Sequence, residues 1–312
     1  MKKIIISISF ILIFTLCLIG CSKKTNANIV NIGWIGSLTG DQAVWGDSEY
    51  KALNMYFDKI NAEGGVLGKQ INLIGYDTRG EGAESVSAAR RLIGKDRVVA
   101  IIGPNSSGQA ISISGVLEET HTPSISTAAT NPKVTVIDGT VKPYNFRVCF
   151  IDPYQGDVAA SYSYNKLGAK KAAVLYDVGD DYSQGLTDYF SKTFKSLGGE
   201  IVAYEGFKTG DVDFRAQLTK IKKSNPDIIF MPLYFKEAAL AAKQSREIGI
   251  TSTLIGGDGW PSDQLLAIAG DTINGSYFVN HLDYNDPEVL TYRKNYKNLY
   301  SKESELNGYL AY

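Results

Sequence analysis

Short apolar runs alternate with segments of helical periodicity from residue 29 to the end of the chain. Apolar runs of roughly four to eight residues predict buried strands, and apolar positions at i, i+3, i+4 and i+7 predict amphipathic helices. The first helical spacing is formed by Leu53, Tyr56, Phe57 and Ile60. Gly64-Gly65 follows it and is a typical helix end.

Two successive strand–helix series follow from this pattern. In the first, strands are predicted at 29–36, 71–76, 98–102 and 124–126, with further helices at 84–93 and 109–119. A second series begins near Asn145, with strands at 172–176, 201–204, 227–231 and 253–255. Its helices are marked by Leu186, Tyr189, Phe190, Phe194, Leu197, Phe214, Leu218 and Ile221.

Repeated strand–helix–strand units predict parallel sheets with right-handed crossovers and helices on both faces. Such sheets bind ligands beyond the carboxyl ends of their strands. Two series therefore predict an α/β protein of two doubly wound lobes that face each other across a cleft. Gly80-Glu81-Gly82 lacks the third glycine of a dinucleotide-binding loop, and no phosphate-binding loop motif follows a strand.

The first residues have the composition of a secretory signal. Lys2 and Lys3 precede an apolar run over 4–16, which is too short for an ordinary transmembrane helix. Removing the signal leaves about 290 residues, enough for two domains of ordinary size. The chain carries no second long apolar run, so we do not expect it to be a permease.

Directly after the apolar run, Leu18-Ile19-Gly20-Cys21 resembles the lipobox of bacterial lipoproteins. The resemblance implies a signal peptide over 1–20, a lipidated Cys21 and a polar tether over 21–28. Acyl chains of this kind would hold the exported protein at the outer face of the cytoplasmic membrane. The alternative is a plain signal anchor with an incidental cysteine.

Charge and cysteine content exclude several classes. The 32 basic and 33 acidic residues are balanced and form no basic tract, so we expect no nucleic-acid partner. Cys17 would leave with the signal and Cys21 would be lipidated, so Cys149 would stand alone without a disulfide. His121 and His281 lack metal-ligand spacing, and we expect neither a metal nor a cofactor.

Eight short segments occur in the order and spacing of a known family. They lie at 36–40, 45–47, 60–68, 76–77, 102–107, 128–132, 181–185 and 256–259. Together they resemble the leucine/isoleucine/valine-binding family, the substrate-binding components of branched-chain amino acid ABC transporters. The resemblance implies the type I periplasmic-binding fold, in which two lobes joined by a hinge close on a ligand.

By this resemblance, lobe 1 comprises 29–148 plus 280–312 and lobe 2 comprises 149–279. The family normally links its lobes by three crossovers and continues beyond the position of residue 312. We therefore expect a C-terminally incomplete chain, and the sequence does not determine the third crossover between the lobes.

A free amino acid needs partners for its carboxylate and its ammonium group. Ser107 lies at the predicted start of helix 109–119, where the helix dipole favours an anion. The resemblance makes Ser107 a carboxylate ligand with Thr130 as its partner, although local sequence alone favours a helix cap. It likewise assigns the ammonium to Asp258 and the carbonyl of Ala128. Within Gly-Gly-Asp-Gly, Asp258 could also be a turn residue.

The ligand side chain needs an apolar wall. Trp45 of lobe 1 and Tyr182 and Tyr234 of lobe 2 match the family's aromatic positions, whereas their alternative role is ordinary packing. Trp260 could also reach the cleft.

The sequence thus predicts an exported lipoprotein that captures an amino acid, branched-chain or otherwise aliphatic, for ABC permease subunits. The alternative is a ligand-sensing domain of the same fold that binds an amide or another small polar molecule. We find no nucleophile–base pair, metal set or cofactor loop in the sequence, so we do not expect an enzyme.

Overall fold

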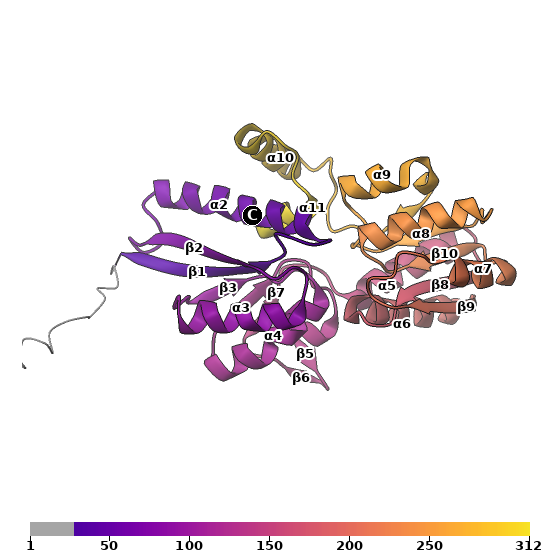
Figure 1. The fold of residues 1–312 in the computed structure, drawn as a ribbon, viewed down its shortest axis with the longest axis horizontal. Helices are drawn as coiled ribbons and strands as arrows, with labels where there is room; N and C mark the ends of the chain where they lie inside the picture. Colours follow the sequence, from indigo (N-terminus) through magenta and orange to yellow (C-terminus); the bar gives the residue numbers. More distant parts are fainter. Residues whose placement is uncertain (1–27) are drawn as a thin grey trace, which may run out of the picture.

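The computed structural model describes residues 28–312. The expected signal peptide, the lipidated Cys21 and the tether up to residue 27 lie outside these residues. Within the described range, every helix is too short or too polar to cross a bilayer. Figure 1 shows two groups of helices and strands, each built around its own sheet.

The first sheet has five parallel strands in the order β2-β1-β3-β4-β7. Their bounds are β1 Ile29–Gly36, β2 Gln70–Asp77, β3 Ala100–Ile102, β4 Ser124–Ser126 and β7 Asn145–Arg147. The connecting helices are α2 Ala43–Ala62, α3 Gly82–Gly94 and α4 Ser107–Thr120. Helix α2 lies on one face of the sheet and α3 and α4 lie on the other (Figure 1).

A short antiparallel hairpin projects between β4 and β7. It comprises a 3-10 turn at Pro132–Val134, then β5 Val136–Ile137 and β6 Thr140–Val141.

The second sheet is also parallel, in the order β12-β11-β10-β8-β9. Its strands are β8 Lys171–Asp177, β9 Glu200–Phe207, β10 Ile228–Met231, β11 Thr253–Gly256 and β12 Tyr277–Phe278. Its helices are α5 Asp152–Ser161 with a π-helical extension at Tyr162–Lys166, α6 Asp181–Ser196, α7 Arg215–Ser224, α8 Phe235–Glu247, and α9 Asp263–Ala269 followed by a 3-10 turn at Gly270–Ile273.

Both faces of the second sheet are buried. Ala173 and Leu175 of β8 belong to the apolar cluster with α7, α8 and α9, whereas Ala172 and Val174 belong to the cluster with α5 and α6. Successive side chains of a strand point to opposite faces, so a strand covered on both sides reads as the continuous apolar run seen in the sequence. This confirms the predicted architecture of two doubly wound parallel sheets.

The last two helices return to the first sheet. Helix α10 spans Pro287–Tyr300 and α11 spans Leu306–Ala311. Tyr292 and Tyr296 of α10 are buried with Ala52 of α2. Within residues 28–312 the chain passes between the sheets twice, from β7 to α5 and from β12 to α10. We use lobe 1 for the first sheet with α2–α4, α10 and α11, and lobe 2 for the second sheet with α5–α9.

Three sequence-based expectations needed correction. The strand near Asn145 does not begin the second series, because β7 pairs with β4 at the edge of the first sheet. Helix α4 begins at Ser107, two residues before the predicted start. Helices α5, α8, α9, α10 and α11 and strand β12 were not predicted. In α8 the buried face consists mainly of small residues whose periodicity is weak: Ala238, Ala239, Ala241 and Ala242.

Candidate ligand-binding site between the lobes

The carboxyl ends of the two sheets converge on a small pocket, which we call the inner pocket. Its lining comes from both lobes and comprises Trp45, Asn105, Ser106, Ser107, Ala128, Asn307, Tyr182, Tyr234, Asp258 and Gly259. Six of the seven predicted ligand-binding residues are among them: Trp45, Ser107, Ala128, Tyr182, Tyr234 and Asp258. The volume is about 20 Å³, which has room for about one water molecule.

Strand order explains this convergence. In lobe 1, β1 lies between β2 and β3, and in lobe 2, β8 lies between β9 and β10. The order along the sheet reverses at these strands, and open parallel sheets bind ligands at such a switch. The segments that follow β3 and β4 supply the lobe 1 residues at 105–107 and 128, of which Ser107 is the first residue of α4. Tyr182 lies at the start of α6, which follows β8, and the loops after β10 and β11 supply Tyr234 and Asp258.

Ser107 is the first residue of α4 and is almost fully buried. The first N–H groups of a helix have no intrahelical partner and carry the positive end of the dipole. The Ser107 hydroxyl oxygen accepts the N–H of Asn131 at 3.2 Å, which holds the loop after β4 against the start of α4. This corner of the inner pocket can therefore bind a carboxylate.

Asp258 faces the inner pocket from lobe 2 with one free oxygen. Its Oδ2 lies 2.8 Å from Nε2 of His281, and the His281 ring stacks on Phe150 with 3.9 Å between centroids. The backbone N–H of Asp258 donates to Oε1 of Gln155 at 2.6 Å. Oδ1 is buried and has no hydrogen-bond partner in the described part of the chain. This oxygen can therefore accept a hydrogen bond from a ligand ammonium group.

The negative charge of Asp258 affects the titration of its neighbours. Burial, reinforced by Asp258, raises the pKa of the Cys149 thiol to about 12. Burial likewise raises the pKa of Asp152 to about 8, with Asp258 adding to the shift and the Thr130 hydroxyl opposing it. Cys149 is therefore an unreactive thiol near neutral pH, and a cation bound at Asp258 would favour the ionised form of Asp152.

Three aromatic rings line one side of the inner pocket. Tyr182 stacks on Tyr234 with centroids 5.2 Å apart, and Tyr234 meets Trp45 edge-on at 5.6 Å. Trp45 reaches lobe 2 because Gly46 lets α2 pack directly on the backbone of Ser37, which a Cβ would contact. The rings make an apolar wall for a ligand side chain.

Two glycines beside Asp258 allow Tyr182 to approach. A Cβ at Gly257 would lie 2.5 Å from the Tyr182 hydroxyl oxygen, and one at Gly259 would lie 2.7 Å from the Leu233 carbonyl. The Tyr182 hydroxyl accepts the N–H of Gly259 at 3.1 Å. The Gly-Gly-Asp-Gly segment is therefore glycine-rich because of close packing around Asp258.

Two side chains that the sequence placed in or near the cleft, those of Thr130 and Trp260, lie outside the inner pocket. Thr130 is buried outside the lining of the inner pocket, and its carbonyl accepts the N–H of Asp152 at 3.0 Å. Trp260 packs in the core of lobe 2, where its Nε1 donates to the Met231 carbonyl at 3.0 Å. Neither side chain lines the inner pocket.

Four lining residues were not predicted: Asn105, Ser106, Gly259 and Asn307. The first three are sequence neighbours of predicted residues, so the position of those loops at the carboxyl ends of strands is a signal that could have found them. Asn307 lies on α11, which packs against α2. Nothing local in the sequence marks Asn307, because only the return of α11 to lobe 1 brings it to the pocket.

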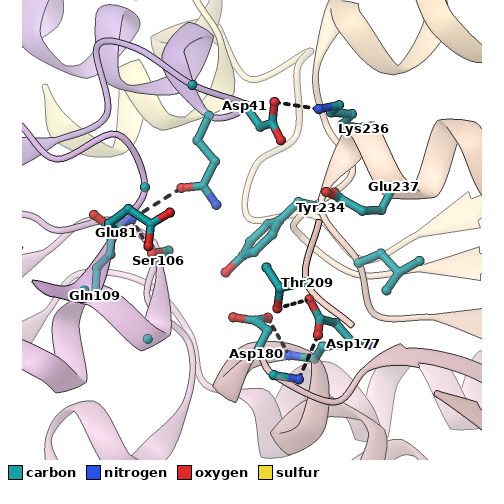
Figure 2. Close-up of a pocket in the computed structure, with 18 of the residues that line it drawn as sticks. Asp41, Glu81, Ser106, Gln109, Asp177, Asp180, Thr209, Tyr234, Lys236 and Glu237 are labelled. Carbon is teal, nitrogen blue, oxygen red and sulfur yellow. Dashed lines mark hydrogen bonds and ion pairs between the residues drawn. The ribbon is translucent and has the colours of Figure 1, made fainter. Parts of the chain in front are cut away.

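A larger space, the outer cavity, adjoins the inner pocket (Figure 2). It has a volume of about 470 Å³ and shares Ser106 and Tyr234 with the inner pocket. Its ionisable residues are mostly acidic and comprise Asp41, Glu81, Asp177, Asp180, Glu237, Arg79 and Lys236. Burial raises the pKa of Asp180 to about 7. Lys236 of lobe 2 pairs with Asp41 of lobe 1 at 2.6 Å, so the two lobes contact each other at this rim.

Comparison with known proteins places these features in a family. The family model for periplasmic binding proteins matches residues 29–312. The chain is 36% identical over 253 residues to an amino acid binding protein of Pseudomonas aeruginosa, covering 80% of this chain and 66% of that protein. It is 33% identical over 285 residues to the Leu/Ile/Val-binding protein BraC3 of Rhizobium johnstonii, covering 90% of this chain and 76% of that protein.

Two solved structures are similar throughout the described fold. The leucine-binding protein LivK of Thermotoga maritima superposes with a TM-score of 0.83 at 36% identity, covering 91% of this chain and 79% of that one. LivJ of Streptococcus pneumoniae, a branched-chain amino acid transporter substrate-binding protein solved with isoleucine, has a TM-score of 0.84 at 32% identity, covering 91% of this chain and 81% of that one.

Proposed function

Because this chain belongs to the periplasmic binding protein family, we propose that it is an extracytoplasmic substrate-binding lipoprotein of an ABC transporter. It captures an amino acid between its lobes and delivers it to the permease. Similar proteins are named for leucine, isoleucine and valine, which supports a branched-chain or other aliphatic amino acid as the ligand.

The observation that carries the proposal is that the two sides of the inner pocket suit ligand groups of opposite charge. The amino end of α4 and Ser107 in lobe 1 suit a carboxylate, and the unpartnered Oδ1 of Asp258 in lobe 2 suits an ammonium group. A buried charge is costly without a partner, and charge-assisted hydrogen bonds are the strong ones. An amino acid supplies both partners at once.

The same arrangement couples binding to closure. The inner pocket has a volume of about 20 Å³, so an amino acid enters only when the lobes move apart. The outer cavity, which shares Ser106 and Tyr234 with it, lies on the route from solvent. A ligand that bonds to both lobes favours the closed form because it gains its full set of contacts only there.

Export and anchoring belong to the same proposal. The lipobox-like segment 18–21 supports lipidation at Cys21, and a tethered receptor stays close to its permease. Cys21→Ser should release the protein from membranes or stall its processing, as measured by cell fractionation and intact mass. Membrane association and mature mass equal to those of the wild type would contradict a lipid anchor.

We propose no catalytic step. The hydroxyl of Ser107 accepts the N–H of Asn131, and within residues 28–312 no carboxylate or imidazole is hydrogen-bonded to it. The alternative, a ligand-sensing domain for an amide or other small polar molecule, predicts the same fold with a different ligand.

A ligand screen with a charge variant tests the binding proposal. Thermal-shift assays of the mature chain against the twenty amino acids should identify a stabilising ligand, because a ligand at about 100 times its Kd adds about 2.7 kcal/mol. Asp258→Ala should weaken calorimetric binding of leucine by about 2–5 kcal/mol, the range for a broken buried charge pair. Asp188→Ala is the matched control, since Asp188 is an exposed residue of α6 in the same lobe.

The outcomes separate the two candidate functions. Leucine binding that falls only in the Asp258 variant supports amino acid capture. Stabilisation by amides or by benzoate, with none by any amino acid, would favour the sensing alternative. Equal affinity in both variants would make Asp258 a structural residue of its loop.

A further inference from the structure

Asn105 presents an unpaired amide to the inner pocket. It follows β3 on the loop that leads into α4, its side chain is 3% exposed, and it lines the pocket. Neither its Nδ2 nor its Oδ1 has a hydrogen-bond partner within residues 28–312. A buried amide is normally paired, so the pocket lacks a polar group at this point.

A buried carboxyl group lies behind Asn105. Glu49 of α2 is fully buried, and its Oε1 accepts the hydroxyl of Thr127 at 2.5 Å. Its Oε2 has no partner in the described chain. The side chains of Trp34 and Asn105 face this carboxyl group and favour its ionised form. The Glu49 carboxyl can attract the amide hydrogens of Asn105, which would leave Oδ1 as the group available to a ligand.

The position of Asn105 relative to the charged groups indicates which part of a ligand it meets. Under the proposed function, the ligand carboxylate lies at Ser107 and the ammonium at Asp258 and Ala128. The side chains that remain in the lining include Trp45, Tyr182, Tyr234 and Asn105. Ser106 and Asn307 also line the pocket, but of these polar side chains only Asn105 has buried amide atoms without a partner in the described chain. The ligand side chain is therefore enclosed by three aromatic rings and meets the unpaired amide of Asn105.

We propose that Asn105, supported by Glu49, makes the inner pocket favour a branched side chain that carries a hydroxyl group over its hydrocarbon analogue. This rests on the proposed function, whose amino acid class it narrows. An aliphatic side chain would leave the buried amide of Asn105 unpaired, which carries a cost in affinity. A ligand hydroxyl in place of a methyl group donates a hydrogen bond to Oδ1 of Asn105. The ligand then supplies the polar partner that this amide lacks.

Threonine and valine test this selection because they have the same shape and differ by a hydroxyl in place of a methyl group. Calorimetry on the mature chain should show threonine binding about tenfold more tightly than valine, which corresponds to about 1.4 kcal/mol. Asn105→Leu removes the amide at similar volume and should reverse the preference in favour of valine. Asn72→Leu changes an exposed asparagine of β2 and should leave the ratio at its wild-type value.

Asn105→Ala provides a second variant of smaller size, and a thermal melt of each variant checks that it is folded. Loss of the threonine preference in either folded variant supports the inference. Valine binding as tightly as threonine to the wild type, or an unchanged ratio in both Asn105 variants, overturns it while amino acid capture stands. If no amino acid binds the wild type, the proposed function fails, and this inference fails with it.

Discussion

Glu49 shows how a single buried carboxyl group can couple protonation to the architecture of a site. It is enclosed by α2 and by the loops that carry Asn105 and Thr127. Burial raises its pKa from the ordinary 4.5 to about 7, while the hydrogen bond from Thr127 and the nearby polar side chains of Trp34 and Asn105 oppose the shift. Both loops end at the inner pocket, so the protonation state of Glu49 affects the groups that line it.

The raised pKa of Glu49 makes folding stability depend on pH. Below pH 4.5 the carboxyl group is protonated in the folded and unfolded chains alike, and its full contribution is present. Between pH 4.5 and about 7 the unfolded chain ionises first, so stability falls as pH rises through this window. The full difference is about 3 kcal/mol, at about 1.4 kcal/mol per pKa unit.

Glu49→Gln should therefore reduce the pH dependence of stability. In denaturant titrations at pH 5 and pH 8, the loss of unfolding free energy between the two conditions should be about 2.5 kcal/mol smaller than in the wild type, since part of the effect is already lost at pH 5. Asp152 is another buried carboxyl with a raised pKa, about 8, so a residual dependence of the same sign should remain. Glu200→Gln, at an exposed position of β9, is the control. A Glu49 variant with the wild-type pH dependence would contradict this assignment.

At the scale of elements, the loop after β11 depends on close packing against α5 and α6. Gln155 of α5 accepts the N–H of Asp258, and Tyr182 of α6 accepts the N–H of Gly259. Both acceptors approach the loop where Gly257 has no side chain. The two helices thus fix the orientation of the loop that carries Asp258, although both are far from this loop in the sequence.

Gly257→Ala should displace this loop. The new Cβ would lie 2.5 Å from the Tyr182 hydroxyl and 2.7 Å from Oε1 of Gln155, so stability should fall by about 1–3 kcal/mol, as is usual for overpacking. Leucine binding by calorimetry should weaken as well.

Gly115→Ala is the control, because it changes an exposed glycine of α4 with no atom within 4 Å of the new Cβ. It should raise stability by about 1 kcal/mol through helix propensity. A neutral effect of Gly257→Ala would mean that the loop adjusts freely.

At the scale of the whole molecule, the lobes contact each other through polar pairs and through aromatic packing. Asp41 pairs with Lys236, and the Asn131 amide donates to the Asp181 carbonyl at 2.7 Å. Trp45 of lobe 1 packs against Tyr234 and Phe235 of lobe 2. Exposed ion pairs contribute little to stability, so the Asp41–Lys236 pair adds little to the cost of separating the lobes.

The closure expected from the proposed function has two readouts. Small-angle scattering should show a smaller radius of gyration with saturating leucine than without it, because the ligand favours the closed form. Tryptophan fluorescence should change in parallel through Trp45, which alone among the three tryptophans lies between the lobes, since Trp34 and Trp260 are fully buried within their own lobes.

Trp45→Phe should abolish the fluorescence change while scattering still reports closure, provided that calorimetry shows the variant saturated with leucine. An identical radius with and without bound leucine would rule out closure around the ligand.

The sequence by itself determined the parts of this protein that depend on local pattern. Apolar runs such as 172–176 predicted strands buried on both faces, because burial depends on the order of residues along one segment. Ser107, Tyr182 and Asp258 could be assigned to a cleft because they follow predicted strands, and the carboxyl ends of parallel strands share one edge of a sheet. Only the tertiary structure decided the features that join distant segments. It paired β7 with β4, brought Asn307 of α11 to the inner pocket and placed His281 against Asp258. It also left the Asn105 amide unpaired in front of Glu49, because whether a buried group finds a partner depends on packing between elements that no local pattern specifies.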